Sequence, residues 1–223
     1  MISSLFGTDN IGLAIMELLQ RVIIVVIALT VHEVAHGWVA KKLGDDTAER
    51  SGRLTLNPLK HLDPIGFLCM VFFSFGWANP VPIRAGRFKN PKRGMAISAL
   101  AGPVSNLLLA LFGTLLFELV GLVDTVSSEF MFNLLKVCLE FLMMFISINI
   151  CLAVFNFIPV PPLDGSRVLF AFLPDKAYFG IMKYERIISI VLLALLYLHF
   201  LDAPLGFLVN SIWRGMRWII PII

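Results

Sequence analysis

Three long apolar segments decide what this chain can fold into. They cover residues Val22 to Ala40, Gly94 to Gly121 and Met131 to Ile158. A helix rises about 1.5 Å per residue, so about 20 apolar residues cross the roughly 30 Å of hydrocarbon in a bilayer. Hydrophobic residues make up 58% of the chain and charged residues 15%, against about 45–50% and about 25% in soluble domains. The sequence therefore predicts an integral membrane protein and excludes a soluble or disordered one.

The remaining apolar segments are weaker. Ile65 to Trp77 is too short for a routine spanning helix, so we expect a short re-entrant or β-like element between the first two long helices. A fourth span is expected at Ile187 to Leu201. The tail, Pro204 to Ile223, is apolar but carries two arginines, so it either crosses the membrane or lies in its interface. The prediction is an all-α polytopic membrane protein with about four to six membrane segments.

The distribution of charge predicts an orientation. The loop after the first span and the loop before Gly94 each carry five Lys or Arg residues, which favours the cytoplasmic side for both loops. The loop from Leu122 to Phe130 has two acidic residues and no Lys or Arg, so we expect it to face outward, as does the N-terminus. The formal net charge of +3 is too small to indicate a nucleic-acid partner.

An HExxH motif in the first span indicates metal chemistry. His32 and His36 are four positions apart, so a helix places both imidazoles on one face, where they can bind one zinc ion. Glu33 lies beside them, placed to accept a proton from water activated by the metal. Counting back from Lys41 at about 1.5 Å per residue puts His36 roughly 8 Å deep in the membrane and His32 roughly 14 Å deep. That depth disfavours the alternative, a pair of helix-end histidines among the headgroups.

A catalytic zinc site usually has three protein ligands and one open position, so a third ligand is needed. The candidate is Asp164, in the stretch NFIPVPPLDG from Asn156 to Gly165. Its prolines end the preceding helix, and irregular backbone at membrane depth is tolerated only where it lines a cavity or is buried in protein. The alternative is that Asp164 caps the next helix in a Pro-Pro-x-Asp-Gly turn. The residues alone leave both interpretations open.

Together the two motifs resemble those of the site-2 protease family of intramembrane zinc metalloproteases. The resemblance covers roughly residues 22–172 and is carried by HExxH in a membrane helix and NxxPxPPLDG more than a hundred residues later. It implies that one zinc ion per chain is held by His32, His36 and Asp164, with Glu33 as the catalytic base. It also implies that Asn156 helps to hold the substrate backbone or the oxyanion. The alternative role for Asn156 is a cap on a broken helix end.

The same resemblance implies the biological setting. We expect a single integral-membrane metalloprotease domain over residues 1–223, with its core at about 22–172, of the short bacterial type without PDZ or C-terminal regulatory domains. The expected substrate is a membrane-spanning protein, cleaved within or beside its transmembrane segment. The expected location is the bacterial inner membrane, in contact with the lipid bilayer, with the active site nearer the cytoplasmic face. The sequence gives no indication of the oligomeric state.

Other fragments that resemble the short bacterial members contain further polar residues. We expect His61 to be solvated or bonded within its loop, rather than to be a rival ligand. Asn106 follows Gly102 and Pro103 in AGPVSN; we expect it to bond to neighbouring backbone, with a place beside the active site as the alternative. The apolar run Ile65 to Trp77 and the segment Val81 to Phe88 are expected to supply an edge that pairs with an unwound substrate, with loop packing as the alternative.

A second class of function remains open, namely a zinc-binding membrane transporter or a non-catalytic membrane scaffold. A transporter would be expected to carry polar or acidic residues on several spans. Outside the HExxH motif, the three long segments contain as charged residues Glu118, Lys136 and Glu140, all toward the outer end. A scaffold would not need Glu33, which is not required as a ligand. The sequence therefore favours the protease.

Overall fold

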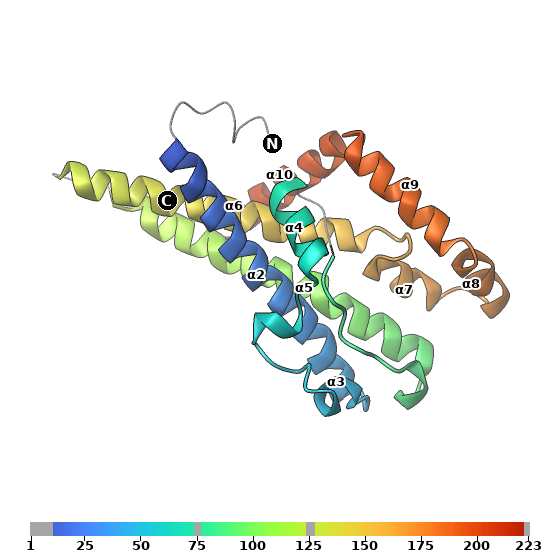
Figure 1. The fold of residues 1–223 in the computed structure, drawn as a ribbon. Helices are drawn as coiled ribbons and strands as arrows, with labels where there is room; N and C mark the ends of the chain where they lie inside the picture. Colours follow the sequence, from blue (N-terminus) through green and yellow to red (C-terminus); the bar gives the residue numbers. More distant parts are fainter. Residues whose placement is uncertain (1–10, 74–76, 124–127, 221–223) are drawn as a thin grey trace.

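Three long helices form the centre of the molecule. In the computed structural model, which describes residues 11–73, 77–123 and 128–220, these helices are α2 (Ile11–Lys42), α5 (Pro91–Gly121) and α6 (Glu129–Phe157). Helix α5 packs along both α2 and α6, and α2 also contacts α6, so the three cross in the middle of the molecule (Figure 1). Each is long and apolar enough to cross a membrane. The three predicted spans are confirmed.

Shorter elements connect these helices and follow them. Between α2 and α5 lie α3 (Thr47–Arg50), the 3-10 helix η1 (Pro58–Lys60), α4 (Pro64–Phe73) and the 3-10 helix η2 (Ala85–Arg87). After α6 come α7 (Asp164–Phe170), α8 (Asp175–Met182), α9 (Glu185–Tyr197) and α10 (Asp202–Ile219). The described residues contain no β-strand, and their lone β-bridge joins Leu62 to Ala78. The predicted all-α class is confirmed.

The short apolar segment between the first two long helices is helical. Helix α4 has 10 residues, so it is about 15 Å long, half the thickness of the hydrocarbon layer. It packs against α2, and Gly66 allows the chain to return past it: a Cβ on Gly66 would overlap the backbone carbonyl of Trp77. The element is therefore a helix that is too short to cross the membrane. Residues 74–76 of the predicted segment lie outside the described residues.

The predicted edge at Val81 to Phe88 is shorter than expected. Arg84 has extended backbone angles, but the next three residues turn into η2. The extended stretch therefore ends at Arg84, and Phe88 is buried behind it. A Cβ on Gly94 would overlap the Phe88 side chain, so the segment after η2 packs against the start of α5 and offers no free edge.

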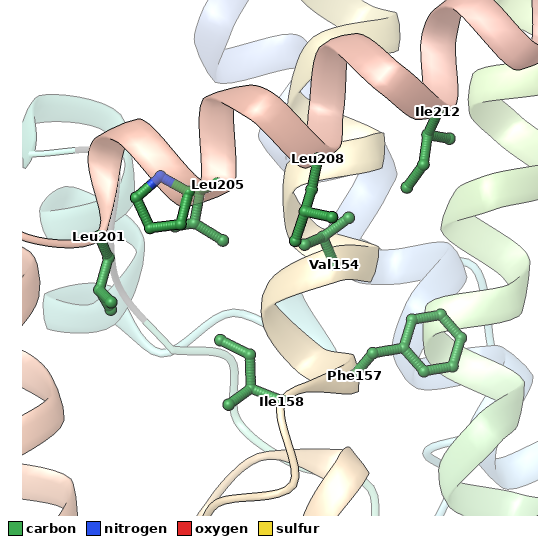
Figure 2. A pocket seen from close by; sticks show the side chains of 8 residues that line it. Val154, Phe157, Ile158, Leu201, Leu205, Leu208 and Ile212 are labelled. Carbon is green, nitrogen blue, oxygen red and sulfur yellow. The ribbon is translucent and has the colours of Figure 1, made fainter.

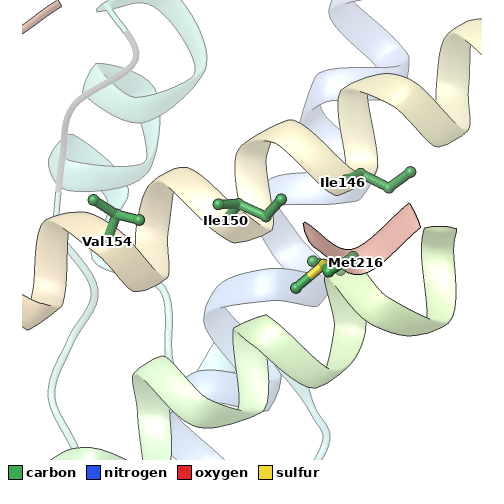
Figure 3. Packing of buried hydrophobic residues seen from close by; sticks show 5 residues of the cluster. Ile146, Ile150, Val154 and Met216 are labelled. Carbon is green, nitrogen blue, oxygen red and sulfur yellow. The ribbon is translucent and has the colours of Figure 1, made fainter. Parts of the chain in front are cut away.

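A tightly packed core joins α6 to α5 and α10. In a membrane, helices associate through close packing more than through the hydrophobic effect, and small residues permit that approach. A Cβ on Gly113 would lie 2.9 Å from the Phe145 ring, so α5 and α6 are in close contact there. The buried members of the core, of which Figure 3 labels four, are Ala110, Ile146, Ile150, Val154 and Met216.

The C-terminal helices form a bent pair. Helices α9 and α10 meet at 81° and count as one further membrane span only when taken together, so the described helices give three spans, or four with this pair. Helix α10 packs on α6 and α5, and its Arg217 forms an ion pair with Glu118 of α5. Glu118 is buried, so this pairing neutralises a carboxylate that the apolar helix bundle would otherwise leave uncompensated.

Candidate metal centre

The HExxH motif lies toward the C-terminal end of α2. His32, Glu33 and His36 are all buried, each with less than a tenth of its surface exposed. One helical turn brings the two histidines to the same face, and their Nε2 atoms are 3.0 Å apart. The pairing of the imidazoles expected from the spacing is present.

Asp164 reaches the histidine pair from a distant part of the chain. Its Oδ2 atom lies 3.1 Å from Nε2 of His32 and 3.1 Å from Nε2 of His36. The N-cap of α7 is Leu163, so Asp164 lies in the first helical turn. A Cβ on Gly165 would overlap the backbone carbonyls at the end of α6. Gly165 of the LDG motif thus lets the start of α7 pack closely against the end of α6, in a position where the Asp164 side chain contacts the histidines of α2.

The three converging atoms fit a zinc ion. Two imidazole nitrogens and one carboxylate oxygen are a donor set that catalytic zinc sites use. A tetrahedral zinc ion with bonds of about 2.0–2.1 Å separates its ligand atoms by about 3.3 Å, close to the 3.0–3.1 Å separations of these three atoms. Among the described residues, His32, His36 and Asp164 form a group able to hold a metal ion.

Each histidine has an acceptor at its other ring nitrogen. The carbonyl oxygen of Ser98 lies 2.7 Å from Nδ1 of His36, and Oδ1 of Asn106 lies 2.6 Å from Nδ1 of His32. A carbonyl oxygen only accepts, so Nδ1 of each ring carries the proton and Nε2 presents its lone pair. Both rings therefore have the tautomer that binds a metal through Nε2.

Gly102 of α5 borders the space in front of the two ring nitrogens. A Cβ built on Gly102 would overlap Nε2 of His32 and Nε2 of His36. Any larger residue would fill the place where the ligand atoms converge. The fragment AGPVSN, which has Gly102 and Asn106 one helical turn apart, therefore lines the site with one and bonds to His32 with the other.

These observations agree with the comparisons with known proteins. Residues 20–199 match Peptidase family M50. The chain belongs to this family. It is therefore a zinc metalloprotease, and the resemblance to the site-2 proteases is confirmed. "Putative zinc metalloprotease YwhC" of Bacillus subtilis (strain 168) is 40% identical over 174 residues, which cover 78% of this chain and 78% of that protein.

Two mycobacterial proteins are also similar to this M50 chain. "Putative zinc metalloprotease Rip3" of Mycobacterium tuberculosis is 27% identical over 201 residues, which cover 86% of this chain and 42% of that protein. "Putative zinc metalloprotease Rip2" of Mycolicibacterium smegmatis is 32% identical over 150 residues, covering 64% of this chain and 52% of that protein. The chain thus spans about half the length of these two relatives. No solved structure gives a significant match.

Glu33 of this M50 peptidase has a defined partner. Its Oε2 accepts a 2.7 Å hydrogen bond from the backbone N–H of Val81, in the extended segment that follows α4. The bond fixes one carboxylate oxygen and leaves the other able to accept a proton. The sequence places Glu33 beside the histidines but gives no indication of this contact, because Val81 contributes a backbone group that every residue except proline has.

The remaining predicted residues have different surroundings. Asn156 lies in the last turns of α6, where its Nδ2 donates to the Leu152 carbonyl at 3.0 Å, and it is not a member of the three-residue metal group. His61 is fully buried, and its Nε2–H donates to the Thr55 carbonyl at 2.7 Å. Bonding within the loop is confirmed for His61, and solvation is not.

A place beside the active site is the alternative that the sequence allows for Asn106, and the structure shows Asn106 there, in a contact with His32 that the sequence does not predict. A polar amide in an apolar span costs free energy unless it is bonded, and this was the available signal for Asn106. The backbone interaction expected for it is also present, because its Nδ2 lies 3.3 Å from the Ala28 carbonyl.

A separate cavity of about 400 Å³ lies between the end of α6 and α10. Figure 2 shows apolar side chains from both helices turned toward it. Its lining residues, none of them titratable, are Val154, Phe157, Ile158, Leu201, Pro204, Leu205, Leu208 and Ile212. The cavity therefore offers no group for acid–base or metal chemistry.

Proposed function

We propose that this zinc metalloprotease is an endopeptidase that cleaves a peptide bond within or beside the transmembrane segment of a membrane-protein substrate. The observation that carries the proposal is the convergence of Asp164 with His32 and His36, two residues inside an apolar helix long enough to span a membrane. A peptidase site on such a helix is placed for a bond that lies in the bilayer rather than in solution.

In the proposed mechanism, His32, His36 and Asp164 hold one zinc ion, which when bound supplies Lewis-acid polarisation of the scissile carbonyl and lowers the pKa of water. Glu33 accepts the proton of the attacking water and transfers it to the leaving amine. Its carboxylate is held by the Val81 N–H, so its orientation is set before the substrate arrives.

Substrate binding is proposed to involve the extended segment and the end of α6. A helical substrate hides its carbonyls in its own hydrogen bonds, so it must unwind locally before cleavage. The segment before η2 is anchored by Arg53, whose Nη2 donates to the Asn79 carbonyl at 2.6 Å. We propose that this anchored segment pairs with the unwound substrate, and that Asn156 turns from the Leu152 carbonyl to the substrate backbone or the oxyanion.

The proposed location is the inner membrane of a bacterium, with the catalytic centre nearer the cytoplasmic face. The relatives named above come from bacteria. The motif is near the end of α2 that carries Lys41 and Lys42, and basic residues favour the cytoplasmic side. We propose that residues 1–223 form one domain with its core at about 22–172, because α10 packs on α5 and α6.

The Glu33→Gln variant tests this function. We expect it to retain zinc and to lose cleavage of a model single-span substrate by roughly 10²–10⁴-fold, the usual contribution of a general base. A transporter or scaffold would be unaffected, because Glu33 is not needed as a ligand. Unchanged cleavage in Glu33→Gln would overturn the proposed role of Glu33, and no cleavage of any single-span substrate by the wild type would overturn the proposed substrate class.

A comparison of membrane proteomes identifies the substrates. Cells carrying the wild-type chain are compared with cells carrying Glu33→Gln at equal expression. We expect single-pass membrane proteins to accumulate in the variant. Accumulation of soluble proteins alone would contradict cleavage in the membrane.

A further inference from the structure

A relay of two asparagine side chains crosses the three central helices behind the metal centre. Asn106 of α5 and Asn149 of α6 are both fully buried. Nδ2 of Asn106 donates to Oδ1 of Asn149 at 2.9 Å, and Oδ1 of Asn106 accepts from Nδ1 of His32 on α2 at 2.6 Å. The relay therefore ends on a candidate zinc ligand, and the proposed function assigns no role to either amide.

The direction of every bond in the relay is fixed from its far end. Nδ2 of Asn149 donates to the Phe145 carbonyl at 2.9 Å, so Oδ1 of Asn149 faces Asn106 as an acceptor. Asn106 must therefore donate to Asn149 through its amide nitrogen, and the same nitrogen also donates to the Ala28 carbonyl. Oδ1 of Asn106 is then turned to His32, where it can only accept.

We infer that Asn106 and Asn149 are positioning residues that fix the tautomer and ring orientation of His32 for zinc binding. The inference rests on the proposed role of His32 as a ligand. An acceptor at Nδ1 keeps the proton on that nitrogen, leaves the Nε2 lone pair toward the metal and raises the basicity of the ligand. Without Oδ1 of Asn106, the His32 ring can rotate or move its proton to Nε2, and either change removes the donor.

A purely structural role makes a different prediction. Buried amides also link helices in membranes through hydrogen bonds between them. In that case any replacement of Asn106 would weaken the fold, and zinc affinity would follow stability alone. The two roles are separated by a replacement that keeps the acceptor oxygen and loses the amide protons.

The experiment measures zinc affinity by chelator competition on purified, detergent-solubilised protein. Asn106→Leu has similar volume and no acceptor, and we expect its zinc affinity to fall about 10- to 100-fold, as for other groups that support a metal ligand. Asn106→Asp keeps an oxygen toward His32, so its affinity should stay within about 3-fold of the wild type. The absorption spectrum of bound Co²⁺ should shift in Asn106→Leu and stay close to the wild type in Asn106→Asp.

Matched controls make the outcome decisive. Thr114→Val removes a fully buried hydroxyl eight residues further along α5, and its zinc affinity should not change. Wild-type affinity in Asn106→Leu, or an equal fall in Asn106→Leu and Asn106→Asp, overturns the inference. Where Asn106→Leu does not accumulate in membranes, Asn149→Leu and Asn149→Asp decide by the same criterion. His32→Ala is the reference: if it keeps zinc, the ligand assignment fails, whereas loss of zinc there beside normal affinity in Asn106→Leu refutes the relay alone.

Discussion

The backbone N–H of Val81 lies 2.7 Å from Oε2 of Glu33, and the two residues are 48 positions apart in the chain. The bond joins the segment after α4 to the general base of the proposed mechanism. Farther along the segment, the N–H of Arg84 donates to Oδ2 of Asp45 at 2.6 Å. Glu33 within α2 and Asp45 just beyond its end thus hold the same segment against the helix that carries the two histidines.

The contact between Val81 and Glu33 predicts a selective effect of proline at position 81. Val81→Pro removes the N–H and leaves Glu33 without its donor, while the metal ligands are untouched. A hydrogen bond to a charged group contributes about 1.5–3 kcal/mol, so we expect cleavage to fall by about 10- to 100-fold with zinc content unchanged. Val81→Ala keeps the N–H and is the control. Equal activity of the two variants would exclude a role for this bond.

The parts of the site that the sequence predicts are those with local periodicity or a resemblance. The four-residue spacing of His32 and His36 on a helix is enough to place their Nε2 atoms together. Asp164 is more than a hundred residues away, and the residues alone allow it to be either a ligand or a cap; the family resemblance indicates the ligand. Its place beside the histidines depends on Gly165 packing against the end of α6, which is a tertiary contact.

The parts that the sequence does not predict depend on backbone groups and long-range amides. The carbonyl of Ser98 and the N–H of Val81 are present whatever the side chain, so no residue type identifies them. The spans of α2, α5 and α6 follow from length and hydropathy, since a bilayer requires helices of that length. The bilayer does not require the 81° bend between α9 and α10. The composition of the C-terminal segment is compatible with both a spanning and an interfacial helix.

Asp45 predicts a pH dependence of stability. Burial raises the pKa of the Asp45 carboxyl. Hydrogen bonds from the Thr47 hydroxyl and from the backbone N–H groups of Arg84 and Thr47, together with the charge of Arg87, lower this pKa by more than burial raises it. The pKa of Asp45 in the folded protein therefore lies below its usual value. Ionised Asp45 therefore stabilises the fold above the unfolded-state pKa of about 4. This stabilisation is lost as the pH falls through the folded-state pKa.

The Asp45→Asn variant tests this dependence by thermal unfolding in detergent between pH 3 and pH 8. At pH 7 we expect the variant to be less stable by roughly 1–3 kcal/mol, as for a buried hydrogen-bonded group. The difference should shrink as the pH falls below about 4. Asp202→Asn, at an exposed carboxylate paired with His199, is the control. A difference that stays constant with pH would contradict the argument.

Gly102 predicts that the smallest enlargement of α5 blocks the metal centre. In Gly102→Ala the added Cβ overlaps Nε2 of both histidines, so the rings must separate and zinc affinity should fall about 10-fold or more. Alanine favours helix over glycine by about 1 kcal/mol, so α5 itself should not be weakened. Gly215→Ala, where a Cβ meets nothing within 4 Å, should bind zinc normally. Normal zinc binding in Gly102→Ala would show that the ligand atoms converge elsewhere.

The role of Asp164 is tested by Asp164→Asn. Asparagine keeps the size of the side chain and much of its ability to cap a helix or form a turn. If Asp164 served mainly as a cap, zinc content and cleavage would barely change. The observed N-cap of α7 is Leu163, and Oδ2 of Asp164 is turned to the two imidazoles, so the capping interpretation has lost its geometric basis.

We therefore expect Asp164→Asn to insert and purify normally but to bind zinc weakly. A neutral amide replaces an anionic ligand, and the two histidines that remain are fewer than the three protein ligands of a usual catalytic zinc site. The loss of zinc affinity should exceed the roughly 10- to 100-fold loss that follows mutation of a residue supporting a ligand. Zinc per protein is measured by elemental analysis, beside cleavage of a model single-span substrate. Near-normal values for both would show that the third ligand is misassigned. His61 would then be the next candidate to test, because its Nε2–H bonds to the Thr55 carbonyl and its Nδ1 keeps a lone pair.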